Sequence, residues 1–458
     1  MAVDSQVFRP NQIQYTMTKD QKRAVGILSI GTFLEYFDLM LYVHMAVVLN
    51  ELFFPKTDHH TAQLLTAFTF CTTYVFRPFG ALLFGWIGDT IGRKFTIVIT
   101  TFAMGISCIV MATASTYDEV GIQAAYIMIA CRILQGMAAM GEVVGALLYL
   151  TELIKRPASF FAVSLIPVFC GLGSVCAIGF AALAISTLGN WRAAFWIGAI
   201  VAGIGIAART TLRETPDFVD ASSKLKCINE EQDIKFSEQY HLFLASNKEH
   251  NKKSYLSLFL IECMWPICFY FIYLYCSDIL QYRLHYSSAQ VVYHNLVITV
   301  FMVGGNIFKS ILCIYFHPMR SFRVLLYISL VLYCITPFWL DSMTSGFELG
   351  ILQVLMIVLV PDIKIISSTV YLYFPVLKRF KATAFLYALS RAVTYVITSF
   401  GIVYLVNWFG NFGIFLALFI GTIGALYGFN HFWKLEKTTG NLDIFTKCLF
   451  TKASVGGF

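Results

Sequence analysis

The chain has 458 residues, of which 58% are hydrophobic and only 13% are charged, and its formal net charge is +7. Soluble globular proteins are about half apolar and about one-quarter charged, so this composition excludes an ordinary soluble protein and predicts one that spans a membrane. The basic residues are scattered over short segments rather than clustered, which argues against nucleic acid as a partner.

Apolar runs that are long enough to cross a bilayer, about 20 residues each, recur along the whole chain. Twelve such runs cover 24–50, 62–88, 95–115, 121–150, 160–187, 191–211, 256–280, 288–316, 322–341, 346–374, 382–408 and 411–433. We therefore predict an all-α membrane protein with twelve transmembrane helices in two six-helix bundles. The bundles span 1–211 and 255–434, a polar loop over 212–254 joins them, and 435–458 form a tail.

Basic residues in the loops predict the orientation, because cytoplasmic loops of membrane proteins carry an excess of lysine and arginine. The loops on one side, together with the central loop, carry nearly all of these residues. The loops on the other side carry only Lys56, Arg192 and Arg283. We therefore expect both termini and the central loop in the cytoplasm. The first twenty residues are polar and show no signal-peptide pattern.

The polar gap between the second and third runs contains a candidate conformational turn motif: Gly85, Gly88, Asp89, Gly92, Arg93 and Lys94. Its first two glycines let a neighbouring helix come close, the third permits a tight turn, and the basic pair holds the loop in the cytoplasm. Asp89 lies at the C-terminal end of its own helix, where the helix dipole disfavours an anion, so it requires a partner. Arg93 and the start of helix eleven, near Lys381, are the candidates. Glu152 is expected to pair with Arg93. The alternative is an ordinary turn between two membrane helices.

Charged side chains inside the helices of the first half are candidate functional residues, because an ionisable group at bilayer depth is costly unless it is paired or hydrated. They are Glu35 and Asp38 in helix one, with Tyr42 one turn further, Arg77 in helix two, and Arg132, Gln135 and Glu142 in helix four. The helical rise places Glu35, Arg77 and Glu142 in one layer, and Asp38 and Arg132 farther from the cytoplasm.

We interpret the three acids Asp38, Glu35 and Glu142 as candidates for proton coupling. An arginine beside a carboxylate keeps it ionised until a conformational change separates the two groups. Arg77 or Arg132 could also bind a substrate carboxylate with two hydrogen bonds. The alternative is a fixed salt-bridge network that locks the helices together, and for Glu142 the two interpretations are equally open.

Charged residues in the second half form a smaller set. Asp362 and Lys364 are two apart, so in a regular helix they point to opposite sides. Asp362 and Arg391 fall at similar depth, and we expect them to pair across helices ten and eleven. Lys309 is expected to extend its amino group toward the cytoplasm. A functional role and a structural role both remain open for these residues.

Helix seven carries an acid and three aromatic residues on one face, namely Glu262, Trp265, Phe269 and Tyr273. Such a face suits a quaternary ammonium group, which is attracted to the faces of aromatic rings. Trp265 is the candidate substrate residue of this set. Because 16% of the chain is aromatic, the alternative is an ordinary packing or lipid-facing surface.

Several motifs of the first half together resemble the major facilitator superfamily and, within it, the metabolite:proton symporters that carry proline, betaine and organic acids. They are Gly31-Thr-Phe-Leu-Glu35-Tyr-Phe-Asp38-Leu-Met-Leu-Tyr42, Arg77-Pro78-Phe-Gly80, Arg132-Ile-Leu-Gln135-Gly136, Gly141-Glu142, Trp191-Arg192-Ala-Ala-Phe195 and Leu212-Arg213-Glu214-Thr-Pro216, with Phe374-Pro375, Arg379 and Arg391 in the second half. The resemblance implies the major facilitator fold, with two bundles that rock about a central site.

From these observations we expect a proton-coupled symporter of a small zwitterionic or carboxylate solute, similar to proline/betaine transporters, in the bacterial inner membrane. Its partners would be the solute, the proton and the lipid bilayer, and it would be a monomer. The cysteines and histidines show no metal-ligand spacing and there is no phosphate-binding loop of the G-x-x-x-x-G-K-[ST] type. We therefore expect no enzyme activity, metal or cofactor. The alternatives are an organic-acid symporter of the 2-oxoglutarate, citrate or shikimate type, a passive uniporter, and a non-transporting relic or sensor.

Overall fold

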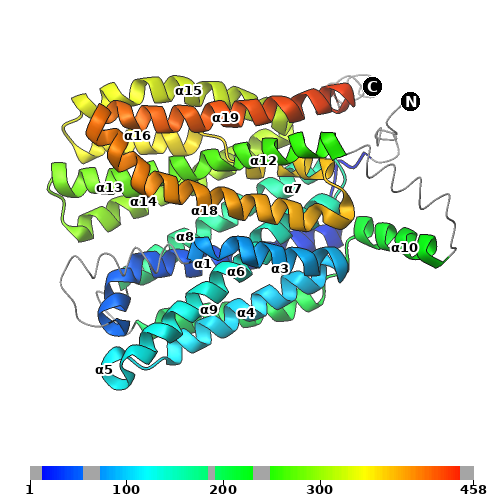
Figure 1. Ribbon diagram of the computed structural model, residues 1–458, viewed down its shortest axis with the longest axis horizontal. Coiled ribbons are helices and arrows are strands. Elements are labelled where there is room, and N and C mark those ends of the chain that lie inside the picture. Colours follow the sequence, from blue (N-terminus) through cyan, green and yellow to red (C-terminus); the bar gives the residue numbers. More distant parts are fainter. Residues whose placement is uncertain (1–12, 55–72, 184–190, 231–247, 444–458) are drawn as a thin grey trace, which may run out of the picture.

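The computed structural model describes residues 13–54, 73–183, 191–230 and 248–443. Within these residues the chain forms helices and no strand. The long helices run roughly side by side and separate into two bundles, with α1, α3, α4, α6, α8 and α9 in one and α12, α14, α15, α16, α18 and α19 in the other (Figure 1). The predicted all-α fold with two bundles of six spans is confirmed.

The first bundle follows the predicted spans closely. Its helices are α1 (Lys19–Phe53), α3 (Arg77–Thr90), α4 (Arg93–Thr113), the short α5 (Tyr117–Val120), α6 (Ile122–Leu153), α7 (Ala158–Ser164), α8 (Ile166–Leu183) and α9 (Arg192–Thr210). Consecutive α7 and α8 together form the fifth span. The predicted second span begins at 62, and its part up to 72 lies outside the described residues. After this bundle comes α10 (Pro216–Glu230).

The second bundle contains two interrupted spans. Its elements are α12 (Lys248–Phe269), the π-helix η3 (Tyr270–Tyr275), α13 (Cys276–Asp278), the π-helix η4 (Ile279–Arg283), α14 (Ser288–Tyr315), α15 (Pro318–Ser342), α16 (Gly346–Leu359), η5 (Ile363–Ile365), α17 (Ser367–Val370), η6 (Tyr371–Tyr373), α18 (Val376–Phe409), α19 (Asn411–Thr438) and η7 (Asn441–Asp443). The seventh span runs from α12 to η4, and the tenth from α16 to η6.

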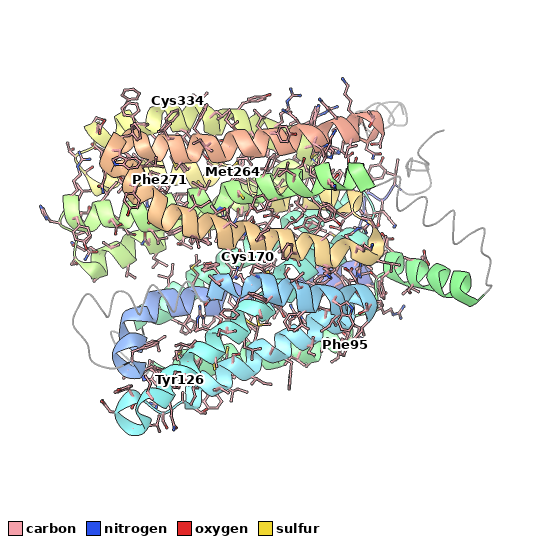
Figure 2. All side chains as sticks on the ribbon, viewed as in Figure 1. Phe95, Tyr126, Cys170, Met264, Phe271 and Cys334 are labelled. Atoms are coloured by element: carbon pink, nitrogen blue, oxygen red, sulfur yellow. The ribbon has the colours of Figure 1, made fainter. Side chains whose placement is uncertain are left out.

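The outer surface is apolar, as a bilayer requires. Nine helical segments of the described chain are long and apolar enough to cross a membrane, and Phe195–Thr210 is a shorter apolar helix. Phe95 and Tyr126 lie on the outside of the first bundle and Cys334 on the outside of the second, whereas Cys170 lies between the bundles (Figure 2). Charged side chains are instead buried inside the protein, where partners can compensate them.

The tenth span is broken, whereas the hydropathy pattern predicts one continuous helix over 346–374. The α-helix ends at Leu359 because Pro361 lacks an N–H group and disfavours helical backbone at the residue before it. Lys309 of α14 donates hydrogen bonds to the carbonyl groups of Ile357 and Val360, both at 2.8 Å, and so satisfies the open end of α16. The expectation that Lys309 extends toward the cytoplasm is therefore wrong: its side chain is buried and serves as a cap.

Candidate functional site

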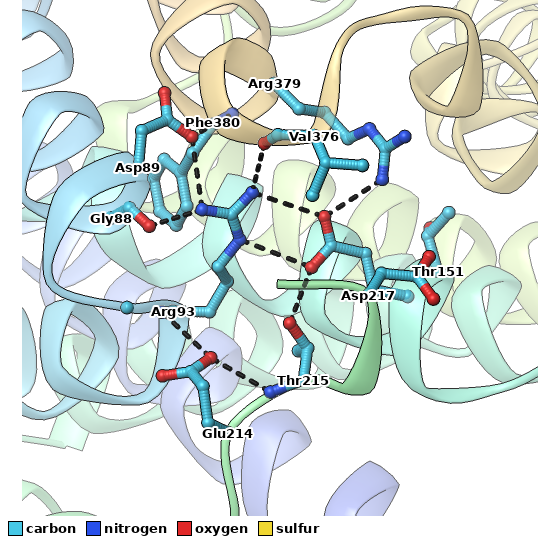
Figure 3. A network of polar contacts seen from close by, with 12 residues as sticks. Gly88, Asp89, Arg93, Thr151, Glu214, Thr215, Asp217, Val376, Arg379 and Phe380 are labelled. Carbon is cyan, nitrogen blue, oxygen red and sulfur yellow. Dashed lines mark hydrogen bonds and ion pairs between the residues drawn. The ribbon is translucent and has the colours of Figure 1, made fainter. Parts of the chain in front are cut away.

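The turn between α3 and α4 lies at one end of the molecule, here called the motif end, and its aspartate contacts the second bundle. Asp89 accepts hydrogen bonds from the backbone N–H groups of Phe380 (3.1 Å) and Lys381 (2.9 Å) near the start of α18. It also forms an ion pair with Arg93, at 3.1 Å between Oδ1 and Nη1 (Figure 3). These are the two partners that the sequence predicts, and a carboxylate at a helix N-terminus is stabilised by the helix dipole.

Arg93 extends this contact into a buried network that joins both bundles (Figure 3). Its Nε atom lies 3.2 Å from Oε2 of Glu152, which confirms the predicted pair. Arg379 of α18 contacts the other carboxylate oxygen of Glu152 at 3.0 Å, and the Thr215 hydroxyl donates to Oε2 at 2.7 Å. Arg93 also donates to the carbonyl group of Val376 at 2.6 Å. Glu152 therefore lies between one arginine of each bundle.

Two glycines of the motif allow α3 to touch α18. A Cβ atom at Gly85 would lie 2.6 Å from the Cα atom of Lys381, and a Cβ atom at Gly88 would lie 2.7 Å from the ring of Phe380. Any larger residue would push the two helices apart. The predicted close approach of a neighbouring helix is therefore confirmed, and that helix is the one whose N–H groups bind Asp89.

Gly92 makes the turn into α4 with a φ of 141°, a backbone conformation that side chains disfavour. The backbone N–H groups of Arg93 and Lys94 at the start of α4 donate to Glu214, at 3.0 and 3.1 Å. Glu214 belongs to one of the sequence motifs, but the sequence does not predict this contact. Glu214 is about 120 residues from α4 along the chain, so the sequence alone does not show which helix it caps. Glu214 ties the segment before α10 to the motif.

Five of the candidate residues meet inside the first bundle and line one small cavity. The lining residues are Glu35, Asp38, Leu39, Thr73, Arg77, Met104, Arg132, Gln135 and Ala139. Asp38 Oδ2 lies 3.8 Å from Arg132 Nη1, which in turn donates to Gln135 Oε1 at 2.8 Å. Arg77 lies over the ring of Tyr74, 4.6 Å from its centroid. The cavity has room for about one water molecule.

Glu142 does not line that cavity and has its own cationic partner. Its Oε2 atom lies 2.6 Å from Nη1 of Arg209, a residue of α9 that sequence reasoning did not single out. The hydroxyl groups of Thr101 (2.7 Å) and Thr100 (3.1 Å) donate to Oε1. This arrangement matches the alternative of a fixed salt bridge more closely than the predicted grouping with Glu35 and Arg77.

The expected pair of Asp362 with Arg391 is wrong. Asp362 Oδ2 lies 2.6 Å from the amino group of Lys364, because the break after α16 places both side chains in one tight turn instead of on opposite sides of a helix. Arg391 forms its ion pair with Glu262 of α12. It also donates to the Glu262 carbonyl group at 3.4 Å, which lacks a helical partner because Pro266 has no N–H group.

The aromatic face predicted on helix seven is occupied by protein contacts. Glu262 is neutralised by Arg391, and the π-helix after Phe269 changes the register of the residues that follow. Phe269 and Tyr273 pack at 4.9 Å between ring centroids, and the Lys309 amino group lies 5.9 Å from the centre of the half-buried Trp265 ring. The side chain of Tyr42, the remaining candidate, lies outside the described residues.

Comparisons with known proteins agree with this architecture. The family model described as Major Facilitator Superfamily matches residues 28–364. The proline/betaine transporter of Escherichia coli K12 is 27% identical over 387 residues, which cover 81% of this chain and 75% of that protein. The glycine betaine/proline/ectoine/pipecolic acid transporter OusA of Dickeya dadantii is 27% identical over 290 residues, covering 62% of this chain and 57% of that protein.

Solved structures of transporters share the fold at low sequence identity. The proton:xylose symporter XylE, bound to 6-bromo-6-deoxy-D-glucose, superposes with a TM-score of 0.70 at 16% identity and covers 89% of this chain and 94% of its own. The transporter FucP in its outward conformation gives a TM-score of 0.64 at 12% identity, over 90% and 99% of the two chains. The match of the family model over most of the chain shows that this protein belongs to the Major Facilitator Superfamily, a family of multi-pass membrane transporters.

Proposed function

We propose that this chain is a proton-coupled symporter of a small zwitterionic or carboxylate solute and that it works by alternating access. The observation that carries the proposal is the cavity in which Glu35, Asp38, Arg77 and Arg132 meet. Burying two acids and two arginines in an apolar bundle is costly, and a protein that needed only a stable fold could use apolar residues there. A transporter has a reason to keep these acids and arginines, because they can bind a proton and a charged solute.

In this proposal the acids bind the proton and the arginines bind the solute carboxylate. Asp38 is the first candidate for the proton site because Arg132 lies beside it at 3.8 Å and can be drawn away when it binds a solute carboxylate. Glu35 is the second candidate, and Arg77 a second carboxylate ligand. Glu142 has a structural role in this scheme, since Arg209 and two hydroxyl groups satisfy it.

The motif end would face the cytoplasm, together with both termini, and the two bundles over 1–211 and 255–434 would rock against each other. In support, the motif end is closed by contacts between the bundles at Asp89 and Glu152. A solute that enters the cytoplasm must break these contacts. Under this proposal the closed motif end would correspond to a state in which the cytoplasmic path is shut.

The solute is assigned from the relatives, whose names include proline, betaine, ectoine and pipecolic acid. A carboxylate would bind Arg132 or Arg77, and the ammonium group would face the aromatic residues near Trp265 only after the protein contacts that occupy this face have opened. Glu262 could bind the ammonium group only if it released Arg391. A dicarboxylate is the second candidate, because two arginines line one cavity and could each bind one carboxylate.

Counterflow in proteoliposomes tests the proposal. Vesicles loaded with unlabelled proline, betaine, 2-oxoglutarate, citrate or shikimate would be offered the same labelled solute, with and without a proton gradient. We expect exchange of proline or betaine, and accumulation only with the gradient. Exchange of a dicarboxylate alone would favour the second candidate. Accumulation that survives collapse of the gradient would contradict proton coupling, and failure with every solute would contradict transport.

A further inference from the structure

A second pocket lies at the motif end, outside the bundle interior, where α15 begins and α19 ends. It is lined by Arg320, Arg323, Trp433, Lys437 and Leu442, and its volume is about 280 Å³. Small-molecule sites have volumes of about 300–1,000 Å³, so the pocket is near the lower end of that range. The pocket is distinct from the cavity proposed for the solute, since the two share no lining residue.

The walls of this pocket are well packed. Phe322 of α15 and Phe429 of α19 stack with their ring centroids 5.4 Å apart, and Phe429 packs against Trp433 at 5.8 Å. The guanidinium of Arg323 lies over the Trp433 ring, 4.8 Å from its centroid. These contacts hold the two helices together and orient one cation of the pocket. The site is therefore built from side chains that the core of the second bundle fixes.

The charge of the pocket favours an anion. Three of its five described lining residues are basic and none of the five is acidic. Arg320 and Arg323 lie in the first two turns of α15, where the positive end of the helix dipole disfavours cations. A bound anion would offset both the repulsion between Arg323 and Lys437 and the effect of the dipole. Arginine and lysine side chains are the groups that most often bind phosphate in proteins.

Exposed apolar side chains occur farther along α15 and α19, the two helices that form most of the pocket. On α15 the exposed side chains include Val324, Tyr327 and Val331, and on α19 they include Tyr427 and Ile420. In a bilayer these faces lie against acyl chains, so an anion in the adjoining pocket would lie beside lipid. A phospholipid would use both parts, because its phosphate would lie among the basic residues and its acyl chains along the apolar faces.

We propose that this pocket binds the phosphate of an anionic phospholipid, with the acyl chains on the exposed faces of α15 and α19. Basic pockets between membrane helices suit such head groups, and each lysine or arginine near a charged membrane surface strengthens binding about fivefold. A zwitterionic lipid would bind more weakly, since its own cation would face Arg320, Arg323 and Lys437.

The test uses the purified full chain in a neutral detergent and follows its thermal unfolding as ligand is added. The ligands are a short-chain phosphatidylglycerol, the matching phosphatidylcholine, and inorganic phosphate. The test variants are the triple change Arg320→Gln, Arg323→Gln and Lys437→Gln, and the single change Lys437→Gln, which alters an exposed side chain and so is compatible with folding. The control removes three exposed basic residues elsewhere, by Lys22→Gln, Arg23→Gln and Lys252→Gln.

We expect phosphatidylglycerol to raise the unfolding temperature of the wild type and of the control at the same concentrations. The single variant should need about fivefold more lipid, and the triple variant about a hundredfold more. Equal responses of the single variant and the control would overturn the site. Equal responses to the two lipids would overturn the preference for an anionic head group. Stabilisation by inorganic phosphate at the concentrations at which phosphatidylglycerol acts would show a soluble anion as the ligand and overturn the lipid assignment.

Discussion

Glu152 of α6 and Arg379 of α18 form a buried ion pair, with 3.0 Å between Oε1 and Nη1, that connects the two bundles at the motif end. A second buried pair, Arg156 with Glu436 at 3.0 Å, connects the segment before α7 to α19 at the same end. Opening the motif end would break both pairs and expose their charges to water, which hydrates them. Such ion pairs can therefore stabilise a closed state and still allow opening, because hydration of the separated charges compensates for the lost ion pairs.

Asp89→Asn is expected to slow transport and to leave solute affinity within about threefold, because Asp89 touches the backbone of α18 and not the cavity. The amide keeps one oxygen acceptor but presents an NH₂ group to N–H donors at Phe380 or Lys381, and it loses the charge that pairs with Arg93. Counterflow rates and equilibrium binding of labelled solute check this. A large loss of binding with a normal rate would show that Asp89 acts on the solute site.

Gly85→Ala is expected to destabilise the closed motif end, since the added methyl group would lie 2.6 Å from the Cα atom of Lys381. Gly26→Ala is the matched control, because no atom lies within 4 Å of its added Cβ. The control should keep or slightly raise stability, as alanine favours a helix over glycine by about 0.5–1 kcal/mol.

Thermal unfolding and transport rate would be measured for both glycine variants. We expect the Gly85 variant alone to unfold at a lower temperature and to transport more slowly. If the two variants behaved alike, the close approach of α3 and α18 would not matter for stability or cycling.

Asp38→Asn is expected to abolish accumulation driven by the proton gradient while it spares exchange, because exchange does not require release of the proton. The amide is close in size to the carboxylate, so the contact with Arg132 and the Cys108 thiol changes in charge rather than in shape. Asp220→Asn, on the exposed surface of α10, is the control. Uptake by the Asp38 variant that still depended on the gradient would exclude Asp38 as the coupling site and direct the test to Glu35.

Hydropathy predicts most of this fold, because the bilayer requires long apolar runs and leaves few alternatives to helices. The partners of Asp89 are also predictable, since an anion at a helix C-terminus requires compensation nearby. Periodicity fails where the backbone leaves the helix. Asp362 and Lys364 meet because the chain turns after Leu359, and a regular helix would separate them.

The sequence also does not predict which charged residues on different helices form ion pairs. Arg391 has Glu262 as its partner rather than Asp362, and Glu142 has Arg209 rather than Arg77. Depth along a helix does not reveal which neighbouring helix supplies the partner. The rotation of each helix about its axis and the identity of its neighbours decide which ion pairs form. Both depend on the packing of the whole bundle.

His317, between α14 and α15, gives a prediction for the dependence of stability on pH. The side chain is buried, its Nδ1 atom accepts the N–H group of Met319 at 3.2 Å as the N-cap of α15, and its ring packs edge-on against Phe160 of α7 at 4.9 Å. Burial, with the positive charges of Arg156 and Arg320, lowers the pKa of His317 from 6.5 to about 3. Below pH 6.5 the unfolded chain therefore binds a proton that the folded protein does not. The contribution of His317 to stability is complete above that pH and declines as the pH falls toward 3.

His317→Asn keeps a capping side chain and removes the titrating ring. Relative to this variant, the wild type should lose about 2 kcal/mol of stability between pH 7 and pH 5, because each pKa unit corresponds to about 1.4 kcal/mol. Loss of the contact with Phe160 would lower the stability of the variant by the same amount at every pH, so it does not affect the slope. Denaturant unfolding of both proteins in detergent at pH 7, 6 and 5 measures the difference. Parallel pH profiles would show that His317 becomes protonated in the folded protein and would contradict its burial as a neutral ring between the two bundles.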